Sequence, residues 1–340
     1  MRPPGVMRVA FLTGDPGSAS ARVRITDALP GLRRRGVEGE LLALPSGWTA
    51  RRRFLRGLSA PDVVVLHRRL LDRLLLRTLR GAARSLVLDL DDAIWTRPSG
   101  RSRRLEGRFA RALRAADLVT VGSQALAEEL RGRHPRVHVI PPVPPPAPPV
   151  AAAPPDGLLH VVWTGSRPTL PYLEAIGPEL AALARVRPGW VLDAIADAPP
   201  ALPGVPLRVH PWSQEREAAL LGGADLGIYP LPLDPWTRGK CAYKVRLYLR
   251  HGLPVVTVPH GGGAEAAGEA GMLVGAAPGA WQAALGALLD DPARRAALGA
   301  EARRLASTRD DPDRRDQALA RALREAAGPT RGFTSRGEAC

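Results

Sequence analysis

Lysine is almost absent from this sequence, and asparagine is absent altogether. The chain has 340 residues and 48 basic side chains, of which only Lys240 and Lys244 are lysine. So strong a bias is typical of a genomic base composition that replaces lysine codons with arginine codons wherever either residue serves. The two differ where a compact, rotatable ammonium is needed, as beside a phosphate. The two lysines, four residues apart on a predicted helix, therefore mark a candidate anion site, although chance and a solvated helix face explain the spacing equally well.

Cysteine, aromatic residues and long apolar runs are also scarce. Cys241 and Cys340 provide no disulfide framework, which favours a reducing, cytoplasmic location. No run approaches the roughly 20 apolar residues that span a bilayer, and the start, MRPPGVMRVAFLTG, lacks the apolar core of a signal peptide. Aromatic residues make up 4% of the chain, too few for the stacking platforms of nucleic-acid-binding proteins. Binding to nucleic acid stays a remote alternative, suggested by the net charge of +15.

A proline-rich segment divides the chain into two parts. Residues 141–157, PPVPPPAPPVAAAPPDG, cannot form a helix or a central strand, because proline lacks the amide hydrogen and restricts φ. The hydrophobic content of 45% is enough for each part to bury a core. We predict an N-terminal domain over 1–142, a linker over 143–157, a C-terminal domain over 158–327 whose last helix can pack back on the first domain, and a disordered tail over 328–340.

The positive charge belongs to the first part. Residues 1–150 carry 27 arginines against 13 Asp and Glu, whereas residues 151–340 carry 21 Arg and Lys against 20 Asp and Glu. The densest stretches are 49–58 and 97–114. The same compositional bias, acting on solvent-exposed helices, explains part of this excess of arginine. The asymmetry nevertheless indicates an anionic partner for the N-terminal domain, such as a membrane surface or a phosphorylated acceptor.

Apolar runs alternate with helical patterns in both parts. Continuous apolar strands between helices favour parallel sheets covered on both faces, so we predict an α/β protein with two doubly wound, Rossmann-like domains facing across a cleft. In such sheets ligands bind beyond the carboxyl ends of the strands. The predicted strands are 7–12, 62–66, 85–90, 117–121 and 136–140 in the first part, and 158–163, 190–195, 224–229, 253–258 and 271–275 in the second.

In the first part, polar residues follow three of the predicted strands. A Gly/Ser-rich turn, TGDPGSASARVR, leads from the first strand into a predicted helix over 20–36. His67 follows the second strand, and Asp91 and Asp92 follow the strand that contains Asp89. Such an Asp cluster is compatible with a divalent cation. The preferred interpretation is a carboxylate that orients a hydroxyl or balances the charge of nearby arginines. The metal-dependent sugar-nucleotide enzymes that carry such an Asp pair have one mixed sheet, whereas this chain has two similar halves.

In the second part, three loops have the composition of phosphate-binding loops. The turn after strand 158–163 offers the hydroxyls and backbone amides of Ser166 and Thr169, with Arg167 between them. The strand 224–229 leads to the two lysines. The strand 253–258 is followed by the glycine run 261–263, which allows a ligand to approach the backbone closely.

These motifs together resemble the retaining, family-4-like GT-B glycosyltransferases, over nearly the whole chain. The resemblance rests on the ARVRI helix, LHRRLL, DLDDAIW, WTGSRPTLPYL and DPWTRGKCAYKVRLYLRHGLPVV. It implies a nucleotide-sugar donor bound by the C-terminal domain, an acceptor bound by the N-terminal domain, and cationic side chains in place of a metal or other cofactor. The sequence departs from the wider family at Gly239 and Leu247, where glutamates are expected.

We therefore expect a cytoplasmic glycosyltransferase, peripheral to a membrane if its acceptor is lipid-linked. A GT-B-fold epimerase or phosphorylase and a nucleotide-sugar-binding protein without turnover are alternatives. No metal site is expected. The predicted site residues are Lys244, Lys240, Asp91 and Asp92 for catalysis, Gly165, Ser166, Arg167, Thr169, Arg238, Tyr243, Gly261, Gly262, Gly263 and Glu265 for the donor, and Gly14, Arg22, Arg24 and His67 for the acceptor.

Overall fold

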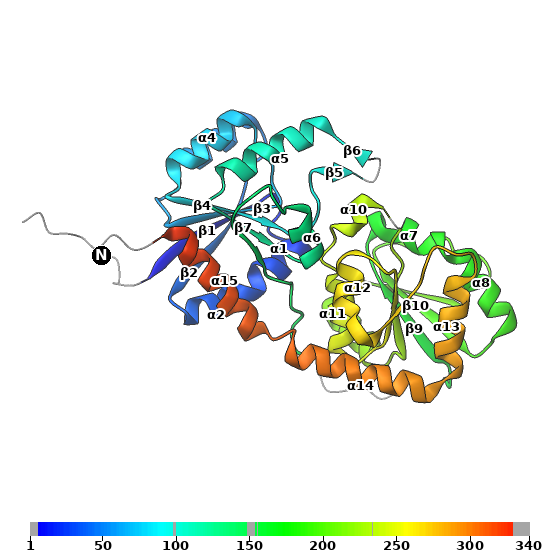
Figure 1. Ribbon diagram of the computed structural model, residues 1–340. Helices are drawn as coiled ribbons and strands as arrows, with labels where there is room; N and C mark the ends of the chain where they lie inside the picture. Colours follow the sequence, from blue (N-terminus) through cyan, green and yellow to red (C-terminus); the bar gives the residue numbers. More distant parts are fainter. Residues whose placement is uncertain (1–5, 98–99, 148–153, 155, 233, 329–340) are drawn as a thin grey trace, which may run out of the picture. The chain divides into compact units, whose positions relative to one another are not determined.

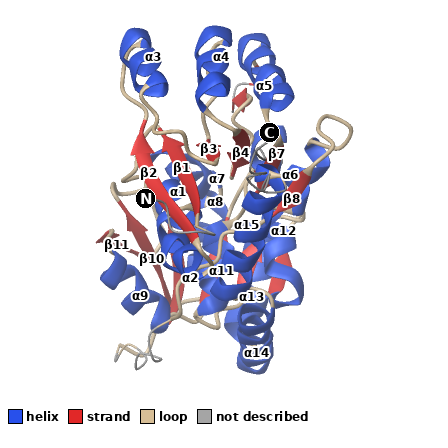
Figure 2. Ribbon diagram, turned by 90° about the vertical axis from the view of Figure 1, so that its left-hand side faces the viewer, coloured by secondary structure: helices blue, strands red, loops and turns tan. Residues whose placement is uncertain are grey.

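The computed structural model describes residues 6–97, 100–147, 154, 156–232 and 234–328. They form two compact units, each built on one six-stranded parallel sheet with helices on both faces (Figures 1 and 2). The predicted α/β class with two doubly wound domains is confirmed. Unit 1 takes in the described residues of Met1–Gly122, Ala127–Ile140 and Asp313–Cys340, and unit 2 those of Ser123–Leu126 and Pro141–Pro312.

The sheet of unit 1 has the strand order β2-β1-β3-β4-β7-β8, and all of its pairings are parallel. β3 and β4 are buried along their whole length, as expected of central strands covered on both faces. Edge strand β2 was not predicted. A short hairpin, β5 (Thr96–Arg97) and β6 (Gly100–Arg101), lies outside the sheet. The sheet strands are β1 (Met7–Thr13), β2 (Val37–Ala43), β3 (Val63–His67), β4 (Ser85–Leu90), β7 (Leu118–Val121) and β8 (Val137–Val139).

The helix predicted over 20–36 is broken in two. A 3₁₀ turn, η1 (Thr26–Ala28), separates α1 from α2, and Pro30 stands in the first turn of α2. Proline is tolerated there because the first amides of a helix have no intrahelical acceptor. The other helices up to residue 129 follow the predicted alternation. The bounds are α1 (Ala19–Arg24), α2 (Leu29–Arg34), α3 (Trp48–Arg56), α4 (Arg73–Ala82), α5 (Arg103–Ala115) and α6 (Gln124–Glu129).

The last helix, α15 (Pro312–Ala327), returns to unit 1 after the chain has built unit 2. Leu319 and Leu323 of this helix are buried in one core with Phe11 of β1 and Val65 of β3. Figure 1 shows α15 (red) beside α2 on one side of the sheet and α4 and α5 on the other. Unit 2 therefore ends at Pro312, and the segment 313–327 belongs to the N-terminal core.

The sheet of unit 2 has the strand order β11-β10-β9-β12-β13-β14, again with parallel pairings throughout. Five of its strands were predicted, and edge strand β11 was not. The strands are β9 (Leu159–Thr164), β10 (Trp190–Ala196), β11 (Leu207–Pro211), β12 (Leu226–Tyr229), β13 (Val255–Thr257) and β14 (Gly271–Leu273).

Two hydrophobic cores cover the two faces of this sheet. One contains Leu192 of β10, Leu180 and Leu285, and the other contains Val255 of β13 and Leu249. The first thus joins the sheet to α8 and α13, and the second joins it to α11. The helical elements are η2 (Arg167–Thr169), α7 (Leu170–Ala175), α8 (Gly177–Val186), α9 (Gln214–Gly222), α10 (Pro235–Arg238), α11 (Tyr243–Arg250), α12 (Gly261–Ala267), η3 (Gly268–Ala270), α13 (Ala280–Asp290) and α14 (Pro292–Thr308).

Two predicted segments lie partly outside the described residues. These are residues 148–153 and 155 of the predicted linker, and residues 329–340 of the predicted tail. None of the described helices combines the length and the hydropathy that crossing a bilayer requires.

Candidate functional site

Lys244 lies in the first turn of α11, whereas Lys240 lies in the loop between α10 and α11, so the prediction that both lie on one helix is wrong. Each lysine lies beside a tryptophan ring. The Nζ atom of Lys240 lies 3.8 Å from the ring centroid of Trp236, and the Nζ atom of Lys244 lies 5.1 Å from that of Trp163. Trp236 belongs to α10 and Trp163 to the carboxyl end of β9. Aromatic faces attract cations, so each ring positions an ammonium group without neutralising it. The lysines therefore form a positively charged cluster beyond the carboxyl end of β9, where parallel sheets bind ligands.

Gly165 has a packing role beside this cluster. A Cβ atom at position 165 would lie 1.9 Å from the ring of Trp163. Only glycine therefore lets the Trp163 ring occupy its place beside Lys244. The sequence predicted Gly165 as a donor contact, and the structure adds this indirect contribution to the position of the ammonium group.

The environment of Lys244 disfavours its positive charge. Burial, together with the neighbouring charge of Lys240, lowers the pKa of Lys244 from 10.5 to about 7, while Glu217 and Asp197 oppose the shift. A lysine in this state is only partly protonated near neutral pH, and an added anion would restore its charge. Strongly shifted pKa values of this kind are common at functional sites.

The loop after β9 uses its backbone amides internally. The Ser166 amide donates to Thr169 Oγ1 (3.0 Å), the Arg167 amide donates to the Asp197 carboxylate (2.6 Å), and the Thr169 amide donates to the Ser166 carbonyl (2.7 Å). Thr169 Oγ1 donates in turn to the same carbonyl (2.9 Å). The expectation that these amides are free for a ligand is therefore wrong. The exposed side chains of Ser166 and Arg167 are what the loop offers to solvent.

The glycine run at the start of α12 packs against the lysine segment itself. A Cβ atom at Gly261 would lie 2.8 Å from the Arg238 carbonyl oxygen, and one at Gly262 would lie 2.2 Å from the Lys240 carbonyl oxygen. Gly261 also has a φ of +64°, which favours glycine. The close approach predicted from this run is thus made to the chain's own backbone, where it determines the course of the segment that carries Lys240. Gly263 is buried beside Thr257 and Tyr229.

The other predicted donor residues surround the same segment. Arg238 ends α10 and is exposed, and Tyr243 begins α11 and is half-buried. Glu265 lies in α12, with its carboxylate 3.9 Å from the Arg246 guanidinium. At the positions where the wider family carries glutamates, Gly239 is buried and Leu247 packs in the core of unit 2.

Sequence reasoning missed several residues of this cluster. Glu217 of α9 accepts a hydrogen bond from Thr164 Oγ1 (2.5 Å), and the Thr164 amide donates to the Tyr248 hydroxyl (2.9 Å). These bonds connect β9, α9 and α11 around Lys244. Asp197, which directly follows β10, could have been found by the same strand-end rule that selected Ser166. Glu217 lies in the middle of a helix, and no sequence signal marks it.

His251, which caps α11, makes unit 2 sensitive to acid. Burial, together with the neighbouring charge of Arg250, lowers the pKa of its imidazole from 6.5 to about 4. Below pH 6.5 the unfolded chain therefore binds a proton that the folded chain excludes. The folding free energy that this group contributes is present above pH 6.5 and is lost as the pH falls toward about 4.

Replacing His251 with glutamine is expected to remove this part of the acid sensitivity. Between pH 6.5 and about 4 the unsubstituted protein should lose about 3 kcal/mol more stability than the variant. Chemical denaturation of both proteins across this range measures the difference, and the carboxylates common to both cancel. Equal losses in the two proteins would contradict the buried, neutral state of His251.

Unit 1 contains a second polar cluster at the carboxyl ends of β3 and β4. His67 is buried, its Nδ1 lies 2.7 Å from the Asp89 carboxylate, and its Nε2 lies 2.9 Å from Ser20 Oγ. Ser20 Oγ also donates to the Asp91 carboxylate. Burial alone would raise the pKa of the Asp89 carboxyl, but the Arg24 guanidinium and His67 hold that pKa well below its usual range. Asp89 thus stays charged and orients His67.

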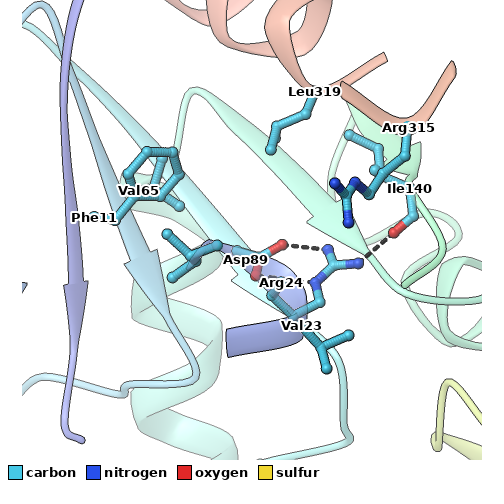
Figure 3. A pocket seen from close by; sticks show the side chains of 9 residues that line it. Phe11, Val23, Arg24, Val65, Asp89, Ile140, Arg315 and Leu319 are labelled. Carbon is cyan, nitrogen blue, oxygen red and sulfur yellow. Dashed lines mark hydrogen bonds and ion pairs between the residues drawn. The ribbon is translucent and has the colours of Figure 1, made fainter. Parts of the chain in front are cut away.

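Arg24 serves this cluster from within the core. Its guanidinium donates to both oxygens of the Asp89 carboxylate and to the Ile140 carbonyl oxygen (Figure 3). Arg24 is buried and lines, with Phe11, a cavity of about 10 Å³, room for about one water molecule. This places Arg24, predicted as an acceptor contact, in a supporting position behind Asp89.

Asp91 and Asp92 share one arginine. Arg68 Nε lies 3.1 Å from Asp91 Oδ1, and Arg68 Nη2 lies 3.3 Å from Asp92 Oδ2. A guanidinium therefore stands between the two carboxylates, where the metal interpretation would require a cation. In the described part of the chain, no group of three or more His, Cys, Asp or Glu residues has the arrangement of a metal site.

Two acceptor candidates remain, Gly14 and Arg22. The Arg69 side chain passes over Gly14, where a Cβ atom would lie 1.3 Å from Arg69 Nη2. Arg22 is half-buried on α1. The structure thus brings Gly14 next to an arginine that the sequence did not single out.

No protein-family model and no curated protein matches this sequence. Solved structures do match, and they share the GT-B fold. Sucrose-phosphate synthase from Thermosynechococcus elongatus matches with a TM-score of 0.72 and 14% identity, over 94% of this chain and 98% of that one. WaaG, a glycosyltransferase involved in lipopolysaccharide biosynthesis, matches with a TM-score of 0.68 and 16% identity, over 93% of this chain and 99% of that one. HepE from Anabaena, in complex with UDP and glucose, matches with a TM-score of 0.67 and 16% identity, over 93% of this chain and 99% of that one.

The same fold occurs in another class of enzyme. A protein assigned as a UDP-N-acetylglucosamine 2-epimerase from Listeria monocytogenes matches with a TM-score of 0.63 and 12% identity, over 94% of this chain and 96% of that one. At these identities the matches establish the fold, and the chemistry has to be argued from the residues.

Proposed function

We propose that this chain is a retaining, family-4-like glycosyltransferase that moves a sugar from a nucleoside diphosphate sugar to an acceptor hydroxyl. The observation that carries the proposal is the cationic cluster of Lys240 and Lys244 in unit 2, next to the exposed Ser166 and Arg167. Structures with this fold include one in complex with UDP and glucose. A diphosphate fits the cluster because it restores the charge that burial disfavours at Lys244.

Leaving-group stabilisation would be the main contribution of unit 2. As the bond between the anomeric carbon and the diphosphate oxygen breaks, negative charge accumulates on the diphosphate, and the two ammonium groups stabilise it. The acceptor oxygen attacks the same face of the sugar and passes its proton to the departing diphosphate. No protein nucleophile, metal or other cofactor is needed in this scheme.

Unit 1 would supply the acceptor site. Its polar cluster offers Ser20 of α1 together with Asp91 and Arg68, and the buried His67 and Asp89 hold Ser20 in place from behind. Such groups can orient an acceptor hydroxyl. The excess of arginine in residues 1–150 supports a phosphorylated or lipid-linked acceptor and a peripheral position at the inner face of the cell membrane.

A second candidate is a GT-B-fold epimerase, favoured by the epimerase with the same fold. The two candidates differ in their products. Incubation with a panel of nucleotide sugars, followed by NMR of the products, tests them together. Release of the nucleoside diphosphate with an α-linked product from an α-linked donor supports retaining transfer, whereas conversion at the sugar 2-position supports the epimerase. Calorimetry on the same panel recognises a protein that binds the donor without turnover.

A further inference from the structure

Three helices of unit 1 form one continuous outer layer. α4 packs beside α3 on one side and beside α5 on the other, and Figure 2 shows the three as neighbours at the top of the view. The layer coincides with the two most basic stretches of the sequence. We call its outer side the arginine face; its members are Trp48, Arg52, Arg53 and Arg56 on α3, Arg73, Leu74, Arg77 and Arg80 on α4, and Arg111 and Arg114 on α5.

A groove on the arginine face runs between α4 and α5. It has a volume of about 770 Å³, and no acidic side chain is among the described residues that line it. The groove is open at Gly81, where a Cβ atom would have nothing within 4 Å. Eight residues line this arginine groove: Arg73, Leu76, Arg77, Arg80, Gly81, Arg111, Arg114 and Ala115.

Most of the groove's positive charge is not neutralised within the protein. Arg80 has an acidic partner in Asp117 at 2.7 Å. Among the described residues, no ion pair involves Arg73, Arg77, Arg111 or Arg114. The Nε atom of Arg111 is, moreover, buried without a hydrogen-bond partner.

Two large apolar side chains stand in the same layer. Leu74 is 57% exposed and lies three residues before Arg77, on the same side of α4. Trp48 is 41% exposed at the start of α3, with the Arg52 guanidinium 5.7 Å from its ring centroid. Arginines that surround exposed Trp and Leu are typical of a surface that enters the lipid headgroup region.

We infer that the arginine face docks on membranes that contain anionic phospholipids, with headgroup phosphates in the arginine groove and Leu74 and Trp48 in the interfacial layer. A free phosphate or a nucleic acid would explain the arginines but not Leu74, which can neither stack on a base nor bind an anion. The inference specifies the membrane partner of the proposed function. Vesicle binding needs no turnover, so its failure and the failure of glycosyl transfer are distinguishable.

Co-sedimentation of the full chain with vesicles tests this inference. We expect binding to vesicles of phosphatidylcholine mixed with phosphatidylglycerol, no binding to pure phosphatidylcholine, and loss of binding as salt screens the charges. Arg77 and Arg114 are exposed, and the double variant Arg77→Gln/Arg114→Gln should weaken binding about 30-fold. Leu74→Ser should weaken it about tenfold at any salt concentration.

The matched control carries the same charge change in unit 2. Arg185→Gln/Arg294→Gln replaces two exposed arginines on α8 and α14, and it should bind the vesicles as tightly as the unsubstituted protein. Equal weakening by the control, or unchanged binding by the groove variant, would overturn the inference. Tighter binding of inorganic phosphate or a single-stranded oligonucleotide than of the vesicles would overturn it as well.

Discussion

Replacing Lys244 with alanine is expected to lower glycosyl transfer by about a hundredfold to a thousandfold, the usual loss when one charge-stabilising group is removed from an active site. The reason is that the Lys244 ammonium would lie against the leaving diphosphate, held beside the Trp163 ring. The fold should be unaffected, because the substitution removes a charge that burial already disfavours. Initial rates with the donor identified from the panel measure the loss, and unchanged thermal unfolding confirms the fold.

Two further measurements make this prediction specific. Arg294→Ala, an exposed arginine on α14, should retain full activity. Because the pKa of Lys244 is about 7 in the free protein, donor binding above that pH should take up a proton, which calorimetry in buffers of different ionisation enthalpy detects. Undiminished turnover in Lys244→Ala, or proton uptake that persists in that variant, would remove Lys244 from the mechanism.

Replacing Arg246 with alanine is expected to destabilise unit 2 by about 3 kcal/mol, the lower end of the usual cost of removing one partner from a buried ion pair. Arg246 and Asp310 pair with each other, and the side chain of each is 2% exposed. Arg246 lies on α11, two residues after Lys244, and Asp310 follows α14. The Asp310 carboxylate would keep its ion pair with the partly exposed Arg309 (3.1 Å) but would lose its buried partner, and chemical denaturation measures the loss.

The double variant Arg246→Met/Asp310→Leu removes both charges of the pair at once. It should recover most of the lost stability, because apolar residues of similar volume often replace a buried ion pair without a net cost. The exposed pair of Arg304 and Glu301 on α14 is the matched control, and Arg304→Ala should leave the denaturation midpoint unchanged. A variant Arg246→Ala as stable as the unsubstituted protein would show that the pair makes no net contribution.

The sequence predicted those residues of the candidate site that lie at the ends of strands. Asp91, His67 and Ser166 were selected by their place at the end of an apolar run, and each lies at or just beyond a strand end. The two lysines were selected by their rarity and lie further along the chain, around the start of α11. Which of their atoms are available was not predictable. The Ser166 amide bonds Thr169 Oγ1, and no sequence pattern reports a hydrogen bond between side chain and backbone that tertiary packing completes.

Two of the four edge strands of the six-stranded sheets, β2 and β11, show the corresponding limit for the fold. The central strands were predicted because they are buried on both faces and are therefore apolar throughout. β2 contains Glu38 and Glu40, and β11 contains Arg208 and His210. β2 pairs with β1, and β11 pairs with β10. These hydrogen bonds join backbone atoms, so they impose little pattern on the side chains from which a strand is predicted.

By itself, the sequence determined the α/β class, the two-part division and the elements that carry the polar residues, because hydrophobic periodicity and proline act locally. The sequence left it open whether the last helix packs back on the first domain, and the tertiary structure decided that α15 lies in the core of unit 1. Only the tertiary structure decided that Gly262 packs on the Lys240 carbonyl. It also brought Arg73, Arg77 and Arg111 to one groove. These contacts join residues far apart in the chain, and their partners are chosen by burial and charge in three dimensions.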